Sequence, residues 1–247
     1  MPRCYFTSGT SLYALERQMM QVPRQELEQY ALRLSHRTPQ RERSFWHLFH
    51  YQSENVDCKL CVQSKSRKTC QLKTCPYLGE RIEAGVADLQ TLLQDHFSSV
   101  KNQEFQKRLY RLFPTKSCSL FLNSYHREQW LYYWNYHFQF SHTSPATRKK
   151  MAALYLFSAY FDVWRRVGWK NRDNDFAFDL SKLRGIQTEL YGVFYVGKSI
   201  ALGKTIDFDD LAIPELISDE AFRLIIYALL IAQYGSAVLR LDGNRGE

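Results

Sequence analysis

Four cysteines lie within eighteen residues of this 247-residue chain, at Cys58, Cys61, Cys70 and Cys75. Their spacing, C-x2-C-x8-C-x4-C, brings together the four thiolates that complete the tetrahedral shell of a structural Zn²⁺. The residues around them are mostly Lys, Arg, Ser and Thr. Such a segment has few apolar side chains to bury, so a bound metal is the better source of its ordering free energy. The spacing therefore predicts a zinc module at residues 56–78.

Two other interpretations of the cysteines stay open. Four thiolates also hold iron–sulfur clusters, and the cysteines can equally be unliganded thiols of a loop. If Zn²⁺ is bound, four thiolates leave no position for water, so we expect a structural metal and no metal-dependent catalysis.

Basic residues surround the cysteines and indicate an anionic partner. The chain has a formal net charge of +8, and residues 59–73 include five bases and no acid. These bases are Lys59, Lys65, Arg67, Lys68 and Lys73. We expect them to contact nucleic acid. The alternative is a solvated loop whose charge balances the thiolates.

A second cluster, WRRVGWKNR, interleaves Trp164 and Trp169 with cations. The cations are Arg165, Arg166, Lys170 and Arg172. Rings stack on bases while Arg and Lys hold phosphates, so the cluster is a second candidate for nucleic-acid or partner binding. The alternative is that the tryptophans cap the core at a helix end, where the cations favour the C-terminus.

One further match points to an enzyme. Gly192–Ser199 reads GVFYVGKS, which fits the phosphate-binding loop G-x4-G-K-[ST]. Its interior is bulky where a phosphate cradle needs open backbone amides, and the remainder of the chain is too short for a nucleotide-binding sheet. We therefore predict that the match is accidental. No residue set typical of nucleophilic or acid–base catalysis is recognisable, so we expect no enzymatic activity.

The elements that must position these residues are predicted to be helices. Apolar residues recur with helical spacing, and caps mark several ends. The expected helices are 24–34, 76–97, 101–113, 123–137, 144–167 and 218–235. Four glycines punctuate residues 171–210, where we expect short helices and turns with room for a small hairpin. On the 123–137 helix, His126, Trp130, Trp134 and His137 share a face, which predicts an aromatic core face with histidines at its margin.

The sequence thus predicts a mostly α, multi-helix globular protein with an inserted Cys4 zinc-binding loop. We expect a helical N-terminal region at 1–115, containing the zinc module, and a helical C-terminal domain at 116–247. No secretory signal is visible, and the longest apolar run, Leu224–Ala232, is too short to span a bilayer. We expect a cytoplasmic protein with no membrane partner, in which metal binding is favoured over disulfides.

The C-terminal half resembles a family of small, uncharacterised accessory proteins from plasmids, prophages and integrative elements of Gram-positive bacteria. Phe121, Leu122, Asn123 and His126 match the F-L-N-x-x-H start of that family. Met151–Trp164 and Phe222–Gly235 match its buried and final helices. The resemblance implies an accessory gene of a mobile element, where DNA transactions and counter-defence are common tasks. The family has no established activity, so no functional residue is carried over.

We therefore expect a non-enzymatic, zinc-stabilised binding protein of a mobile genetic element, contacting nucleic acid or a nucleic-acid-processing complex. The alternative is an anti-CRISPR-like inhibitor of a host defence nuclease. Residues 186–222 hold seven acids against Lys198 and Lys204, and this acidic stretch or the basic loop would then dock on the enzyme.

Overall fold

The computed structural model describes residues 52–53, 56, 58, 61, 71–75, 77–114, 119–137, 144–170, 175–179 and 183–241. The expected helix at 24–34 lies outside them. The chain divides into two compact units, one of residues 1–71 and 75–87, the other of residues 72–74 and 88–247. The boundary expected at 115–116 lies inside the second unit, between two of its helices.

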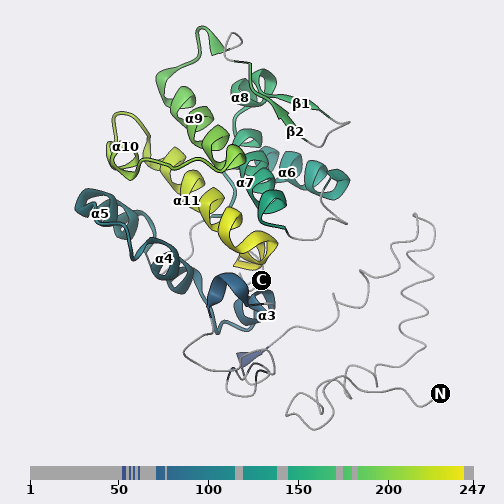
Figure 1. Cartoon of the computed structure of the whole chain (residues 1–247), viewed down its shortest axis with the longest axis vertical. Helices are drawn as coiled ribbons and strands as arrows, with labels where there is room; N and C mark the ends of the chain where they lie inside the picture. The colour runs from purple at the N-terminus through teal and green to yellow at the C-terminus, as the bar shows by residue number, and fades with distance from the viewer. Residues whose placement is uncertain are drawn as a thin grey trace, which may run out of the picture. The chain divides into compact units, whose positions relative to one another are not determined.

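The described residues are mostly helical, which confirms the predicted mostly α, multi-helix character of the fold (Figure 1). The inserted Cys4 zinc-binding loop stays a prediction. The first unit contains α3 (Leu78–Glu83). The second contains η3 (Leu72–Thr74), α4 (Leu89–Phe97), α5 (Gln103–Leu112), α6 (Ser124–His137), α7 (Pro145–Ser158), α8 (Phe161–Arg166), β1 (Gly168–Lys170), β2 (Asp175–Ala177), α9 (Thr188–Leu202), α10 (Phe208–Ala212), α11 (Asp219–Tyr234) and η5 (Gly235–Leu241). The strands form an antiparallel hairpin in which Trp169 lies opposite Phe176.

The core of the second unit is built on α7, α9 and α11, which lie side by side in Figure 1 and contact one another. From Met151 to Ser158 every residue of α7 is buried. A helix that is apolar all round must be surrounded by other elements. Phe157 of α7 stacks on Phe194 of α9, with ring centroids 6.0 Å apart, and meets Phe176 of β2 at 5.3 Å. The hairpin and α9 are therefore joined to the core through one aromatic cluster.

The helices α4 and α5 pack against α11 in the same unit. Phe105 of α5 lies 5.6 Å from Phe222, and Phe113 lies 5.4 Å from Tyr227, measured between ring centroids. The Tyr234 hydroxyl donates to Asp95 of α4 at 2.6 Å. Burial, together with this hydrogen bond, raises the pKa of Tyr234. These contacts place α4 and α5 in one core with the C-terminal helices.

Side-chain caps begin three helices where the sequence predicts them. The Asn123 side chain accepts from the His126 amide at 2.8 Å, and Ser144 accepts from the Thr147 amide at 3.1 Å. Ser218 accepts from the amide of Ala221 at 3.2 Å. Each bond satisfies an amide that the first turn of a helix leaves without a partner.

The helix predicted over 76–97 is wrong as a single element. The helix α3 stops at Gly85, which has a φ of 70°. The Val86 amide donates to Arg81 O at 2.8 Å and the Gly85 amide to Ile82 O at 3.0 Å, the pattern of a Schellman cap. Asp88 then caps α4 by accepting from Thr91 N. Apolar periodicity continues through this break and hides it.

The helix predicted over 144–167 is also two elements. The helix α7 ends at Ser158, and Tyr160 is extended, with a φ of −123°. The Ser158 hydroxyl donates to Tyr155 O at 3.1 Å. Such bonds to the preceding turn compete with regular helix geometry. A second short helix, α8, therefore carries Arg165 and Arg166.

The expectation of short elements over 171–210 is wrong for Thr188–Leu202, where α9 runs for fifteen residues. Gly192 and Gly197 allow close packing instead of ending the helix. A Cβ at Gly197 would lie 2.3 Å from Phe157 Cε1, and one at Gly192 would lie 2.6 Å from Ile217 Cδ1. The GVFYVGKS segment is thus part of a helix, whose interior amides bond within the helix and form no phosphate cradle.

Asp219–Leu241, formed by α11 and η5, is one stretch that is long and apolar enough to cross a membrane. This stretch qualifies by length and composition alone. It is longer than the uninterrupted apolar run Leu224–Ala232, because it includes polar residues. Most of α11 is buried within the second unit, as in the core helix of a globular fold.

Candidate functional site

Three of the four predicted metal ligands are described, and all lie in the first unit. Cys58 is exposed, Cys61 and Cys75 are half-buried, and all three are free thiols. Arg81 Nη1 lies 3.9 Å from Cys75 Sγ, which places a cation beside a predicted zinc ligand. Within the described ranges, no group of three or more His, Cys, Asp or Glu side chains is arranged to hold a metal. Cys70 lies outside those ranges.

Most of the predicted loop bases are not described. Lys59, Lys65, Arg67 and Lys68 lie outside the described residues, as does Arg172 of the second cluster. Lys73 is exposed on η3, and Lys170 is the last residue of β1.

The second predicted cluster is partly assembled on α8, where it meets aromatic side chains of α6. The ring centroids of Trp164 and Tyr133 lie 4.6 Å apart, and those of Tyr133 and Tyr132 lie 5.1 Å apart. Tyr132 is 64% exposed and Phe161 is 60% exposed. We call Tyr132, Tyr133, Phe161, Trp164, Arg165 and Arg166 the α6–α8 surface. Large rings with this much exposure do not serve the core.

Arg165 is the most accessible cation of the α6–α8 surface. Its Cζ lies 5.9 Å from the ring centroid of Phe161, at the edge of cation–π range. Its Nη2 lies 3.5 Å from Asp162 Oδ1, and both side chains are more than half exposed. An exposed ion pair contributes little free energy. The guanidinium can therefore exchange Asp162 for a phosphate at small cost.

The sequence pattern predicts the arginines and Trp164 as binding residues but does not reveal Tyr132, Tyr133 and Phe161. The run of aromatics in α6 is visible in the sequence as WLYYWNY. Nothing in the sequence shows that this helix contacts α8, because the two are joined through α7 and the pairing depends on tertiary packing.

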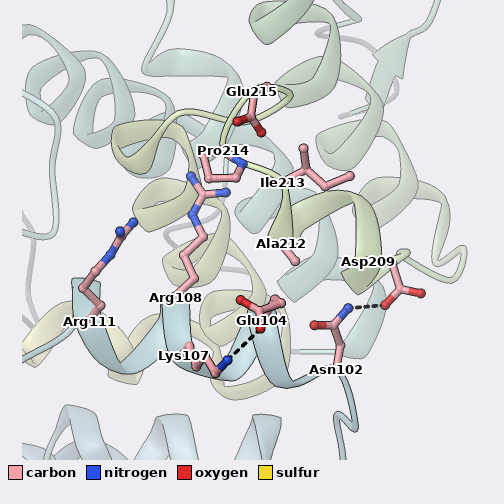
Figure 2. A pocket seen from close by; sticks show the side chains of 10 residues that line it. All are labelled: Asn102, Glu104, Lys107, Arg108, Arg111, Asp209, Ala212, Ile213, Pro214 and Glu215. Atoms are coloured by element: carbon pink, nitrogen blue, oxygen red, sulfur yellow. Dashed lines mark hydrogen bonds and ion pairs between the residues drawn. The ribbon is translucent and has the colours of Figure 1, made fainter.

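A groove of about 590 Å³ lies between α5 and the segment that follows α10 (Figure 2). Its charged side chains are largely paired already. Lys107 Nζ lies 2.7 Å from Glu104 Oε1, and the Asn102 amide donates to Asp209. These charges do not form a recognisable catalytic set.

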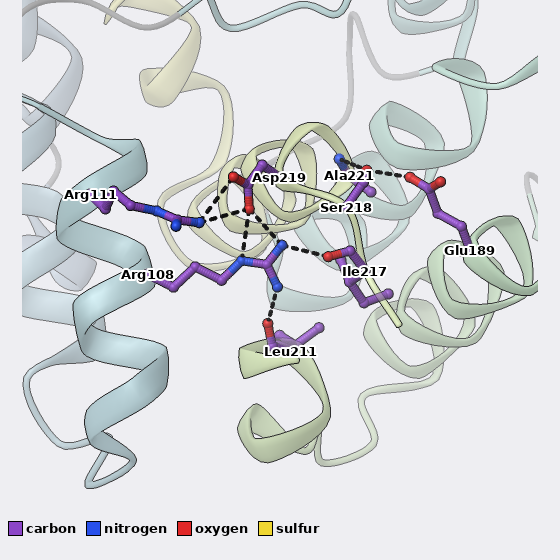
Figure 3. Close-up of polar contacts among 8 residues, drawn as sticks. All are labelled: Arg108, Arg111, Glu189, Leu211, Ile217, Ser218, Asp219 and Ala221. Atoms are coloured by element: carbon purple, nitrogen blue, oxygen red, sulfur yellow. Dashed lines mark hydrogen bonds and ion pairs between the residues drawn. The ribbon is translucent and has the colours of Figure 1, made fainter. Parts of the chain in front are cut away.

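Arg108 joins the floor of this groove to α11, as Figure 3 shows. The residue is only 4% exposed. Its Nε and Nη2 donate to Asp219 Oδ1 at 3.2 and 2.9 Å, and its Nη1 donates to Leu211 O at 2.9 Å. Nη2 also donates to Ile217 O. Arg111 donates to the same Asp219 from the solvent side. A buried guanidinium with its donors engaged is a structural clamp, so Arg108 is not available to a ligand.

His126 is fully buried, so the expectation that it lies at the margin of the aromatic face is wrong. Its Nδ1 accepts from the Leu122 amide at 3.1 Å, which leaves the proton on Nε2 to donate to Tyr155 O at 2.8 Å. Burial lowers the pKa of His126 to about 4. Trp130 on the same face is also fully buried, as predicted. With both ring nitrogens engaged, His126 ties α6 to α7 and does not act as an acid or base.

Among the described residues, the α6–α8 surface combines exposed rings with an exposed cation, and the cysteine segment has Arg81 beside Cys75. Comparison with protein-family models, with curated proteins and with solved structures gives no significant match to this chain.

Proposed function

We propose that this chain is a non-enzymatic, zinc-stabilised binding protein that contacts single-stranded nucleic acid. The α6–α8 surface is one contact region, and the basic loop between Cys58 and Cys75 is another. The proposal rests on the exposure of Phe161 beside Arg165, and of Tyr132 beside Tyr133, whose ring contacts Trp164 of the same helix as Arg165. Exposed rings of this size cost free energy in water unless a ligand covers them.

Single strands suit this surface better than duplexes do. Base–aromatic stacking needs unpaired bases, and it contributes about 1–3 kcal/mol per base. Arg165 supplies a planar cation for a backbone phosphate or for stacking. Arg166, half-buried on the same helix, supplies a second positive charge.

In this proposal Cys58, Cys61, Cys70 and Cys75 hold one structural Zn²⁺. Arg81 beside Cys75 supports it, because a cation close to a thiolate offsets the negative charge of a four-thiolate site. The metal orders the loop that presents Lys65, Arg67 and Lys68.

The resemblance to accessory proteins of mobile elements supports a cytoplasmic role in such an element. An anti-CRISPR-like inhibitor of a defence nuclease is the second candidate. It is favoured by the exposed acids Asp207, Asp209 and Asp210, which suit a basic protein surface better than a nucleic acid.

Titration of purified protein with labelled single-stranded and duplex DNA, over a range of salt concentrations, tests the nucleic-acid proposal. We expect the single strand to bind more tightly, with an affinity that falls steeply as salt rises. Replacing Lys65, Arg67 and Lys68 by Glu together lowers the affinity, and Arg165→Glu lowers it independently. Absence of binding to either DNA at low salt contradicts the proposal.

Metal analysis of the purified protein tests the zinc module separately. We expect one zinc per chain, lost in Cys58→Ser and in Cys70→Ser. Cys118→Ser is the matched control, because this cysteine lies outside the motif and its replacement leaves the metal content unchanged. An iron content in place of zinc would support the iron–sulfur alternative instead.

A further inference from the structure

A second surface of the same unit lies between α9 and residues 206–217, and we call it the α9 groove. It has a volume of about 190 Å³. Apolar side chains such as Val196, Leu211 and Ile217 line it, and all three are buried. Tyr191, Tyr195 and Leu216 stand at its edge and are 48%, 55% and 39% exposed. The groove thus has an apolar floor with large apolar side chains open to solvent beside it.

The groove follows from local sequence. Tyr191 and Tyr195 are four residues apart in α9, so their side chains lie on one face of the helix. Gly192 lies between them, and a Cβ there would lie 2.6 Å from Ile217 Cδ1. The absence of a side chain brings α9 close to Ile217 and leaves the two tyrosines projecting beside the gap.

The charge around the α9 groove is negative. Asp207 and Asp210 line it and are exposed, and the described residues that line it include no Lys, Arg or His. Asp209 and Glu215 lie exposed on the same segment. The chain as a whole has a net charge of +8, so this surface is opposite in sign to the rest. A nucleic acid is repelled here, whereas a basic chain is attracted.

We propose that the α9 groove docks a basic amphipathic helix of a partner protein. One large apolar side chain of that helix enters the groove between Tyr191 and Leu216. Its Lys or Arg side chains then lie near Asp207 and Asp210. The volume fits this occupant, because an engineered cavity of about 150 Å³ is known to hold a benzene molecule.

The two parts of the site contribute differently. Apolar anchors in a desolvated pocket provide most of the affinity of such helix-in-groove contacts. Exposed charges at the rim mainly raise the association rate and select the sign of the partner. This surface is separate from the α6–α8 surface, so it can recruit a protein whether or not the chain binds nucleic acid.

Fluorescence anisotropy of the intact chain with a labelled peptide tests the proposal. The probe is a peptide of about fifteen residues, near the length at which isolated helices become stable, with Leu at helical spacing and Lys elsewhere. A peptide with Glu in place of Lys is its control. We expect the basic peptide alone to bind, and Tyr195→Ala to lower its affinity about tenfold, which is about 1.4 kcal/mol.

Two double variants test whether the acids of the α9 groove, and not the overall charge of the chain, attract the basic peptide. Asp207→Asn with Asp210→Asn removes two charges while Asn retains the cap of α10, and we expect a several-fold loss of affinity together with a weaker salt dependence. Glu128→Gln with Asp162→Asn removes two exposed charges on α6 and α8 and leaves peptide affinity unchanged.

Three results would overturn the proposal. One is failure of the basic peptide to bind, and another is an equal loss of affinity in Tyr110→Ala, whose ring is exposed on α5. The third is self-association of the chain, seen by sedimentation velocity and abolished by Tyr195→Ala, because the occupant would then be a second copy.

Discussion

Arg108 and Arg165 show how differently one residue type is used in two regions of the same unit. Arg108 is 4% exposed and is held by Asp219 and two carbonyl oxygens, whereas the Arg165 side chain is 61% exposed and has one long ion pair. The net charge of +8 counts both equally. Burial and hydrogen bonding, and not the number of basic residues, therefore distinguish an arginine that stabilises the fold from one that is open to a ligand.

The largest expected effect lies in the interior. Arg108→Met leaves Leu211 O and Ile217 O without this donor and leaves Asp219 with Arg111 as its partner, so we expect a loss of about 3–5 kcal/mol of stability. Arg111→Met is the matched control, since Arg111 bonds the same carboxylate but its side chain is 62% exposed. We expect less than about 1 kcal/mol there. Urea unfolding measures both, and similar losses in the two variants would contradict the assignment of Arg108 as a buried clamp.

The buried face of α6 makes stability depend on pH through His126. His126 is buried, and its pKa of about 4 lies below the 6.5 of a free histidine. The unfolded chain therefore binds the proton more readily than the folded chain between these values. The contribution of His126 to the free energy of unfolding is therefore fully present above about pH 6.5. It falls by up to about 3 kcal/mol as the pH drops toward 4.

Chemical denaturation at several pH values measures this slope. Burial also lowers the pKa of His96, which acts in the same direction, so a variant is needed to isolate His126. We expect His126→Gln to flatten the slope while His96→Gln retains most of it. An unchanged slope in His126→Gln would show that His126 is not the group responsible.

Two glycines of α9 are expected to differ in how much stability their replacement costs. Gly197 faces the core, whereas Gly192 faces the α9 groove. A Cβ at Gly197 meets the rigid ring of Phe157, whereas one at Gly192 meets the flexible end of Ile217. We expect Gly197→Ala to cost about 1–3 kcal/mol from overpacking. For Gly192→Ala the gain in helix propensity, about 1 kcal/mol, offsets the contact. Thermal unfolding of both variants would contradict this account if their stabilities changed equally.

Much of this interior is predictable from the sequence. Apolar periodicity identifies α5, and the caps Asn123, Ser144 and Ser218 identify the starts of α6, α7 and α11, because these signals are local. The breaks at Gly85 and Ser158 and the length of α9 are not predictable in the same way. A glycine in the sequence does not reveal which of two roles it has. Gly85 ends a helix, whereas Gly197 lets a helix pack closely against Phe157.

The candidate sites also differ in how far the sequence alone predicts them. The cysteine spacing and the cations of α8 are visible in the sequence, and the zinc assignment stays a prediction. The α6–α8 surface and the α9 groove are not visible, because each requires two segments that meet only in the fold. Arg108 was not singled out either, since nothing local distinguishes it from the exposed Arg111.

The smallest expected effect is that of Arg165→Ala on stability. Its ion pair with Asp162 is exposed, so we expect a change within about 0.5 kcal/mol. Urea unfolding that shows a loss comparable to that of Arg108→Met would place Arg165 in the structural class and remove it from the α6–α8 surface.

Two tyrosine variants test whether single-stranded DNA binds at the α6–α8 surface. Tyr132 on the α6–α8 surface and Tyr110 on α5 are 64% and 56% exposed, so neither replacement by Ala disturbs the core. Anisotropy is measured at low salt with labelled oligothymidylate, longer than the roughly 4–16 nucleotides that one such site occupies. We expect Tyr132→Ala to weaken binding by about tenfold, within the range expected for one lost stacking contact, and Tyr110→Ala to bind like the unaltered protein. Equal affinities of the two variants, or no binding by the unaltered protein, would contradict this expectation.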